Sequence, residues 1–184
     1  MYLNDVTAGE ALTALMDEGD YPSLKSESDV YEEKPTGKQL EYLQMEKEEA
    51  QYHIISTLDD IAWILNVRGN DIPHVPVLLS FLVIGKENAM WFVEENALSD
   101  AVKEMAAECG ITIRPYEDVY AYAATIPEHS SVLLDKRKVN YRITNALSET
   151  VHIVSKANPS QLMKAIKNEI ELENTRKAHL LDGI

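Results

Sequence analysis

The chain has 184 residues with 17 Lys and Arg against 31 Asp and Glu, and therefore a net charge of −14. Because such a charge repels phosphate backbones and anionic lipid surfaces, we expect binding neither to nucleic acid nor to a membrane. No stretch approaches the ~18 to 20 uninterrupted apolar residues that span a bilayer. The single cysteine, Cys109, excludes an intrachain disulfide and every multi-cysteine zinc pattern. We expect a reduced, soluble and cytoplasmic protein.

The acidic excess is concentrated in residues 1–50, which carry 13 acids and 4 bases. Within them, residues 17–38 are rich in Asp, Glu, Ser, Pro and Gly and show little apolar periodicity, a composition typical of an extended linker. We therefore expect residues 1–38 to comprise the end of a preceding domain and an acidic linker, and the folded domain to span residues 39–155.

Regular apolar spacing begins at Gln39 and predicts an alternation of helices and strands. An exposed helix is expected over residues 39–50, a strand over residues 52–56, and then a buried helix that starts at Thr57 with a Ser/Thr-x-x-acid signature. This helix is expected to end at residues 66–69 with a left-handed residue. Later strands are predicted at residues 76–85, 89–93, 111–114, 131–135 and 151–154, and later helices at residues 99–109, 117–124 and 139–147.

Two nearly continuous apolar runs, residues 76–85 and 89–93, lie only three residues apart. The short connection predicts an antiparallel hairpin, and the continuous apolarity predicts central strands that are covered on both faces. A hairpin followed by alternating strands and helices indicates a three-layer α/β domain with a mixed sheet.

The last element is predicted as one long helix, capped by Asn158, with Pro159 in its first turn and its end near Leu180. Its apolar stripe consists of Leu162, Ile166, Ile170 and Leu172. Since no later element follows on which this stripe could pack, we expect its packing partner to lie outside the chain.

No complete catalytic or metal-binding constellation is found in the sequence. The five histidines fall at no recognised metal-ligand spacing, and the P-loop, GxGxxG, GxSxG and HExxH patterns are absent. Adjacent acids point in different directions and are better explained by the helix dipole than by acid–base chemistry; they are Asp59–Asp60, Glu94–Glu95 and Glu117–Asp118. We assign no catalytic and no metal-ligating residue to this chain.

Residues 66–76, with the sequence NVRGNDIPHVP, are the densest set of polar and turn residues between buried elements. An arginine projected from such a loop can hold a carboxylate bidentately, which makes Arg68 a candidate for binding. Pairing with Asp71 would instead give Arg68 a purely structural role, and the residues alone favour that interpretation. His74 lies in the same loop.

A pattern of rarer residues runs through residues 56–85: Leu-Asp-Asp-Ile-Ala-Trp at 58–63, then Asn66, Arg68, Gly69, Asp71, His74 and Pro76. It resembles the second domain of three-domain Xaa-Pro aminopeptidases, the aminopeptidase P group of the creatinase/prolidase superfamily. A second stretch, residues 156–183, is similar to the family's passage into its catalytic domain. It shares Lys164, Lys167, Asn168, Glu171, Arg176, Lys177, Ala178, His179, Asp182 and Gly183.

The resemblance implies a creatinase/prolidase N-terminal-like, ribonuclease-H-like α/β fold for residues 39–155, and makes residues 156–184 the first helix of a pita-bread catalytic domain. In that family two divalent metal ions, usually manganese, are held by two Asp, one His and two Glu further along the chain. These ligands are expected beyond Ile184, so we expect no cofactor in this chain and no catalysis by it alone.

The expected function is that of a non-catalytic domain of a metal-dependent Xaa-Pro aminopeptidase, which removes the N-terminal residue from peptides with proline second. The domain is expected to cap the active site and to make domain and subunit contacts in a homo-oligomer. The expected partners are the remainder of the polypeptide and the peptide substrate, which the resemblance places near Arg68 and His74. One alternative stays open, a free-standing binding or regulatory protein that has the fold without catalysis.

Overall fold

The structure is a computed structural model, and it describes residues 45, 47–86 and 88–183. The predicted end of a preceding domain and the acidic linker, residues 1–38, lie outside the described residues. Of the predicted helix over residues 39–50, only the end is described, where Met45 and Lys47 are helical. Met45 and Ala50 are both buried in the core, so the prediction of an exposed helix is wrong for these residues.

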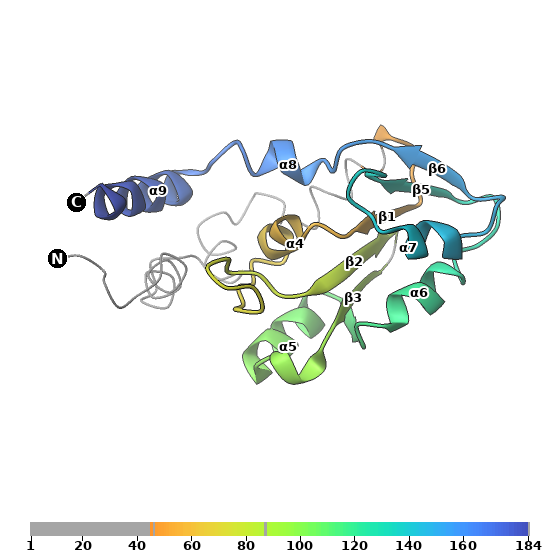
Figure 1. The fold of residues 1–184 in the computed structure, drawn as a ribbon, viewed down its shortest axis with the longest axis horizontal. Coiled ribbons are helices and arrows are strands. Elements are labelled where there is room, and N and C mark those ends of the chain that lie inside the picture. Colours follow the sequence, from red (N-terminus) through yellow and green to blue (C-terminus); the bar gives the residue numbers. More distant parts are fainter. Residues whose placement is uncertain (1–44, 46, 87, 184) are drawn as a thin grey trace.

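A six-stranded mixed sheet forms the centre of the molecule, in the order β4-β3-β2-β1-β5-β6 (Figure 1). The strands are β1 (Tyr52–Ile55), β2 (Ser80–Gly85), β3 (Ala89–Val93), β4 (Ile111–Arg114), β5 (Ser131–Leu134) and β6 (His152–Ser155). β2 runs antiparallel to both β1 and β3, whereas β3–β4, β1–β5 and β5–β6 are parallel pairs. The predicted hairpin and the mixed sheet are confirmed.

Helices cover both faces of this sheet. They are α4 (Leu58–Ile64), α5 (Asp100–Glu108), α6 (Asp118–Ala123) and α7 (Tyr141–Ala146). The described residues also form a short 3-10 helix η2 (Glu95–Ala97), and α8 (Ser160–Met163) and α9 (Glu169–Asp182) follow in the C-terminal segment. One hydrophobic cluster joins the sheet to α4 and α5, and a second joins its other face to α6 and α7. Because neighbouring strand residues point to opposite faces, Trp91 lies in the first cluster and Phe92 in the second. The three-layer prediction is therefore confirmed.

The apolar run that precedes Ser80 belongs to a loop and not to β2. Its backbone groups bond within the loop: the amide of Asp71 donates to the carbonyl of Val77 at 3.3 Å, and the amide of Leu79 donates to Oδ2 of Asp71 at 2.7 Å. Because these backbone groups already have partners within the loop, they do not pair with a neighbouring strand. β2 therefore begins at Ser80, four residues later than predicted.

The single long helix predicted for the end of the chain is wrong. α8 ends at Met163, and α9 starts afresh at Asn168, whose side chain accepts from the amide of Glu171 at 2.8 Å. Oε2 of Glu171 in turn accepts from the amide of Asn168 at 2.9 Å, which completes a capping box. Asn158 does not cap α8, since Pro159 occupies the cap position and makes no side-chain hydrogen bond there.

The apolar side chains of this C-terminal segment are largely exposed. Leu162 and Ile166 keep 72% and 75% of their surface in water, and no residue of α9 is buried. In Figure 1, α9 projects away from the body of the domain. No helix of the described residues is long and apolar enough to cross a membrane.

Replacing Phe92 by alanine is expected to lower the free energy of unfolding by about 3–5 kcal/mol, because it removes a fully buried ring and leaves a cavity. The ring lies 5.4 Å from that of Tyr122, so the aromatic contact is lost as well. Urea denaturation measures the change. Tyr141→Ala is the control: this ring is 80% exposed and its removal is expected to change stability by less than about 0.5 kcal/mol.

Candidate functional site

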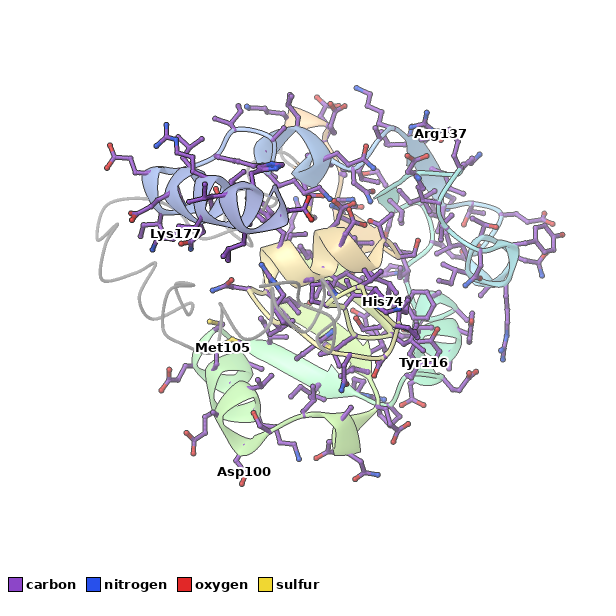
Figure 2. The ribbon with its side chains drawn as sticks, turned by 60° about the vertical axis from the view of Figure 1, so that its left-hand side comes forward. His74, Asp100, Met105, Tyr116, Arg137 and Lys177 are labelled. Carbon is purple, nitrogen blue, oxygen red and sulfur yellow. The ribbon has the colours of Figure 1, made fainter. Side chains whose placement is uncertain are left out.

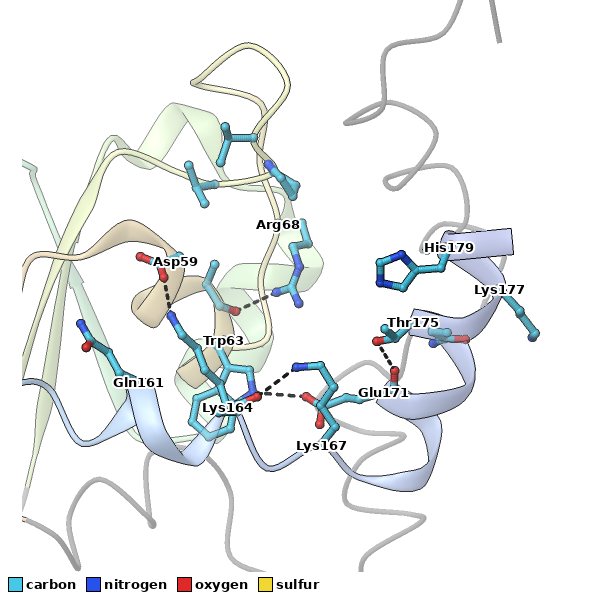
Figure 3. Close-up of a pocket in the computed structure, with 17 residues that line it drawn as sticks. Asp59, Trp63, Arg68, Gln161, Lys164, Lys167, Glu171, Thr175, Lys177 and His179 are labelled. Carbon is cyan, nitrogen blue, oxygen red and sulfur yellow. Dashed lines mark hydrogen bonds and ion pairs between the residues drawn. The ribbon is translucent and has the colours of Figure 1, made fainter. Parts of the chain in front are cut away.

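A pocket of about 600 Å³ lies between α4, the loop of residues 68–77 and the α8–α9 segment (Figure 3). Small and apolar side chains contribute most of its wall, among them Ala62, Trp63, Val75, Val77, Ala165 and Ala178. Its charged lining residues are four cations, Arg68, Lys164, Lys167 and Lys177, and two carboxylates, Asp59 and Glu171. In a chain with a net charge of −14, this is a locally basic site.

The turn after α4 brings the loop back onto the domain. Asn66 has a φ of 49°, which is the left-handed helix end that the sequence predicted. Gly69 then lies so close to the side chain of Leu78 that a Cβ there would come within 2.5 Å of its Cγ. The loop therefore packs tightly against its own returning end, at Val77 and Leu78, next to the position of Arg68.

Arg68 closes the C-terminal end of α4. Its Nη1 donates to the carbonyl of Ala62 at 2.8 Å and to that of Val67 at 2.9 Å. A cation is favourable there because the C-terminal end of a helix carries its negative dipole end; the Ala62 carbonyl also accepts from the amide of Val67 at 3.0 Å. Pairing of Arg68 with Asp71 is not what the structure shows, since Asp71 instead accepts from the amide of Leu79.

The structure separates the two residues predicted to bind substrate. Arg68 is half-buried and lines the pocket. His74 is exposed, has a φ of 67° and is not a lining residue. Figure 2 shows His74 well apart from Lys177, which lies on the pocket side. Substrate binding by Arg68 and His74 stays a prediction.

A buried polar cluster lies beside the pocket, at the start of α4. Asp60 has no exposed surface, and its Oδ1 accepts from Nζ of Lys164 at 2.7 Å. Its Oδ2 accepts from the hydroxyl of Thr57 and from Nδ2 of Asn158, the latter at 3.0 Å. Asn158 also donates to Thr57 at 2.8 Å and lies 3.4 Å from Nε2 of His53. Residues from two distant parts of the chain, the start of α4 and the stretch around α8, therefore meet at one carboxylate.

Both members of the Asp60–Lys164 pair are held in their charged forms. Burial raises the pKa of Asp60, but the hydrogen bonds from Lys164, Thr57 and Asn158 outweigh it and the pKa lies below its ordinary value. Burial likewise lowers the pKa of Lys164, but contacts with Asp59 and Asp60 outweigh it and the pKa lies above its ordinary value. The result is an ion pair of which one partner is fully buried and the other is 25% exposed.

Sequence reasoning missed this pair because it assigned both Asp59 and Asp60 to the helix dipole. Asp59 is exposed and fits that interpretation, apart from its contact with Lys164. Asp60 does not fit it, since it lies on the buried side of α4 with Ile61 and Ile64. A charge on the apolar side of a helix needs a partner, and that was the signal available in the sequence. The partner itself is 104 residues away and has no local signature.

The described residues offer no metal centre. Within residues 45, 47–86 and 88–183, no group of three or more His, Cys, Asp or Glu side chains is placed to hold a metal ion. The two-metal centre that the family resemblance implies therefore does not fit onto these residues, and we derive no catalytic step from them.

Residues 29–171 match the family model described as the creatinase/prolidase N-terminal domain. The chain belongs to this family. It is 37% identical over 149 residues to a probable Xaa-Pro aminopeptidase P of Sordaria macrospora, covering 76% of this chain and 24% of that protein. It is 35% identical over 175 residues to Xaa-Pro aminopeptidase 1 of Dictyostelium discoideum, covering 91% of this chain and 28% of that protein. The chain thus spans about a quarter of the length of these relatives.

Solved structures of this family share the fold. An X-prolyl aminopeptidase from Caenorhabditis elegans superimposes with a TM-score of 0.70 at 24% identity, over 79% of this chain and 25% of that enzyme. The N-terminal domain of the cytoplasmic peptidase PepQ from Mycobacterium tuberculosis gives a TM-score of 0.51 at 11% identity, over 69% of this chain and 97% of that domain. Membership in the superfamily and the creatinase/prolidase N-terminal-like fold, both expected from the sequence, are confirmed.

Lys164→Met is expected to reverse the pH dependence that Asp60 contributes to stability. In the parent chain the lowered pKa of Asp60 stabilises the fold above about pH 4, and this contribution is lost as the pH falls below that value. Without Lys164, burial, the largest single cause, is opposed only by the hydrogen bonds from Thr57 and Asn158, and we expect the pKa of Asp60 to rise. Stability is then expected to fall as the pH rises above about 4. At pH 7 we expect a loss of about 3 kcal/mol, the lower end of the cost of breaking a buried pair, because Lys164 retains some solvent contact.

Urea denaturation between pH 4 and pH 7 measures this effect, with Lys167→Met as the matched control. Nζ of Lys167 makes only a 3.4 Å contact, to the carbonyl of Lys164, and is otherwise exposed. If the free energy of unfolding changed with pH in the same way for Lys164→Met and for Lys167→Met, the assigned role of Asp60 would be contradicted.

Proposed function

We propose that this chain is a non-catalytic domain of a metal-dependent Xaa-Pro aminopeptidase, an enzyme that removes the N-terminal residue from peptides with proline second. The observation that carries the proposal is its identity of 35–37% to Xaa-Pro aminopeptidases over 149–175 residues, within only a quarter of their length.

The proposed division of the chain has three parts. Residues 1–38 are the end of a preceding domain and an acidic linker, residues 39–155 are the creatinase N-terminal-like domain, and residues 156–184 lead into the catalytic domain. Within the last part, the capping box at Asn168 marks where a new helix, α9, begins.

The proposed centre of the whole enzyme contains two divalent ions, with manganese as the metal, in the catalytic domain. The Caenorhabditis elegans relative is described as a cytosolic enzyme with a di-nuclear active site, which supports this proposal and a cytoplasmic location. The catalytic domain and the peptide are the proposed partners, and the enzyme is proposed to be a homo-oligomer.

The proposed role of the domain is to cap the active site, with Arg68 facing the peptide and His74 nearby. Support comes from the basic pocket at the C-terminal end of α4, which Arg68 lines from a tightly packed turn. The fixed position of its guanidinium at the helix end suits an arginine that holds a substrate carbonyl or carboxylate without reorganising.

Sequencing of the transcript beyond codon 184 tests the proposal directly. The reading frame is expected to continue and to encode the two Asp, one His and two Glu that hold the metals. With manganese, the 184-residue chain is expected to release no N-terminal residue from an Xaa-Pro peptide, whereas the longer polypeptide releases it. A stop codon directly after codon 184 would favour the free-standing binding protein, and hydrolysis by the 184-residue chain itself would contradict a non-catalytic role.

Arg68→Ala in the longer enzyme is expected to lower kcat/KM for an Xaa-Pro peptide about 10- to 100-fold, the effect of one lost charge-assisted hydrogen bond of about 1.5–3 kcal/mol. Steady-state kinetics measure it, and His74→Ala tests the second residue in the same assay. Arg142→Ala is the control, since this exposed arginine contacts Tyr120 and Glu117 on the α6–α7 side of the domain. An unchanged kcat/KM for Arg68→Ala would exclude contact with the substrate.

A further inference from the structure

Several polar contacts join the C-terminal segment to α4, and two of them involve the side chains that flank the start of α9. Nζ of Lys164 donates to Oδ1 of Asp60 at 2.7 Å, and Nε1 of Trp63 donates to Oε1 of Glu171 at 3.3 Å. Asp60 and Trp63 are three residues apart, so they lie on neighbouring turns of one helix face. Figure 3 shows Trp63, Lys164 and Glu171 grouped at the base of the pocket. We call these four residues the clamp.

Glu171 couples the start of α9 to its attachment. Its Oε2 accepts from the amide of Asn168 in the capping box, while its Oε1 accepts from the indole of Trp63. If α9 started one residue earlier or later, this carboxylate would lose one of its two donors. The position where α9 begins and the place where it is held to α4 are therefore fixed by the same side chain.

Hydrophobic packing does little to set the direction of α9. No residue of this helix is buried, and Leu172, Leu180 and Leu181 are all 40% exposed or more. A helix of 14 residues is about 21 Å long, so a change of about 10° at its start moves its end by about 4 Å. Such a displacement is large compared with the geometric tolerance of a substrate site.

We propose that the clamp, Asp60–Lys164 with Trp63–Glu171, fixes the direction in which α9 leaves the domain, and thereby positions the following catalytic domain against the turn that carries Arg68. The four residues are positioning residues, since they act through α9 and not on a substrate. The part of this inference that concerns the catalytic domain rests on the proposed function, whereas the part that concerns α9 does not.

Distances between two spin labels test the clamp in the 184-residue chain. The labels are placed at Glu104→Cys on α5 and at Leu180→Cys near the end of α9, both exposed, in a Cys109→Ala background. The parent is expected to give one narrow distance distribution. Trp63→Phe, which keeps an aromatic ring but removes the N–H donor, is combined with Lys164→Met and is expected to widen the distribution at least about twofold.

Three comparisons keep the test decisive. Lys167→Met with Glu173→Gln alters two exposed charges of the same segment and is expected to leave the distribution narrow. Lys164→Arg in place of Lys164→Met is expected to return the distance distribution to nearly the parent width, because it returns a cation to Asp60. Near-UV circular dichroism verifies that the core around the buried Trp91 stays folded, and Trp63→Phe alone serves if the double variant unfolds. The clamp would be overturned if the folded clamp variants gave a distance distribution as narrow as that of the parent. A broad distance distribution in the parent itself would also overturn it.

In the longer enzyme the same double variant is expected to lower kcat/KM for an Xaa-Pro peptide at least about tenfold, with Lys164→Arg restoring most of it. An unchanged kcat/KM beside a widened distribution would overturn the positioning role and leave the clamp standing. The distance measurement needs no catalysis, so a chain that is not part of an aminopeptidase would still show the clamp. Conversely, loss of the clamp would leave the proposed function untouched.

Discussion

The buried ion pair between Asp60 and Lys164 is the interaction on which the attachment of the C-terminal segment to α4 depends. A carboxylate without any exposure to water is tolerable only if its charge is matched at close range, and here a single ammonium group does so with help from two hydrogen-bond donors. The pair connects the first turn of α4 to the end of α8. It therefore ties the last segment to the sheet in the absence of the large apolar interface that normally fixes a helix.

The fold was largely predictable because its information is local. The apolar runs of β2 and β3 need only a short connection to form a hairpin, and α5 lies within the predicted range of residues 99–109 with Ser99 as its cap. The exceptions were decided by contacts that periodicity does not encode. Asn158 was predicted to cap a helix, but its side-chain amide instead donates to the hydroxyl of Thr57, 101 residues away. The real start, Asn168 with Glu171, has a local signature that the apolar stripe concealed.

The candidate site was predictable only in part, for a similar reason. The loop of residues 66–76 could be identified from its density of polar residues, and Arg68 lies in a pocket as a binding residue should. Two of the partners of Arg68 could not be identified, because they are backbone carbonyls near the end of α4, and every residue has such a carbonyl. The same arginine can stabilise a helix end and face a cleft, so its structural and functional interpretations are not exclusive.

The separation of 104 residues between Asp60 and Lys164 also bears on where this domain can be cut. By secondary structure the sheet is complete at Ser155, the last residue of β6. By electrostatics it is not, since a chain cut there would keep Asp60 inside the core and leave its neutralising cation behind. A unit that extends past the sheet to include α8 and Lys164 is therefore expected to be more stable than one that ends at Ser155. The family model, which ends at residue 171, includes this cation as part of the domain.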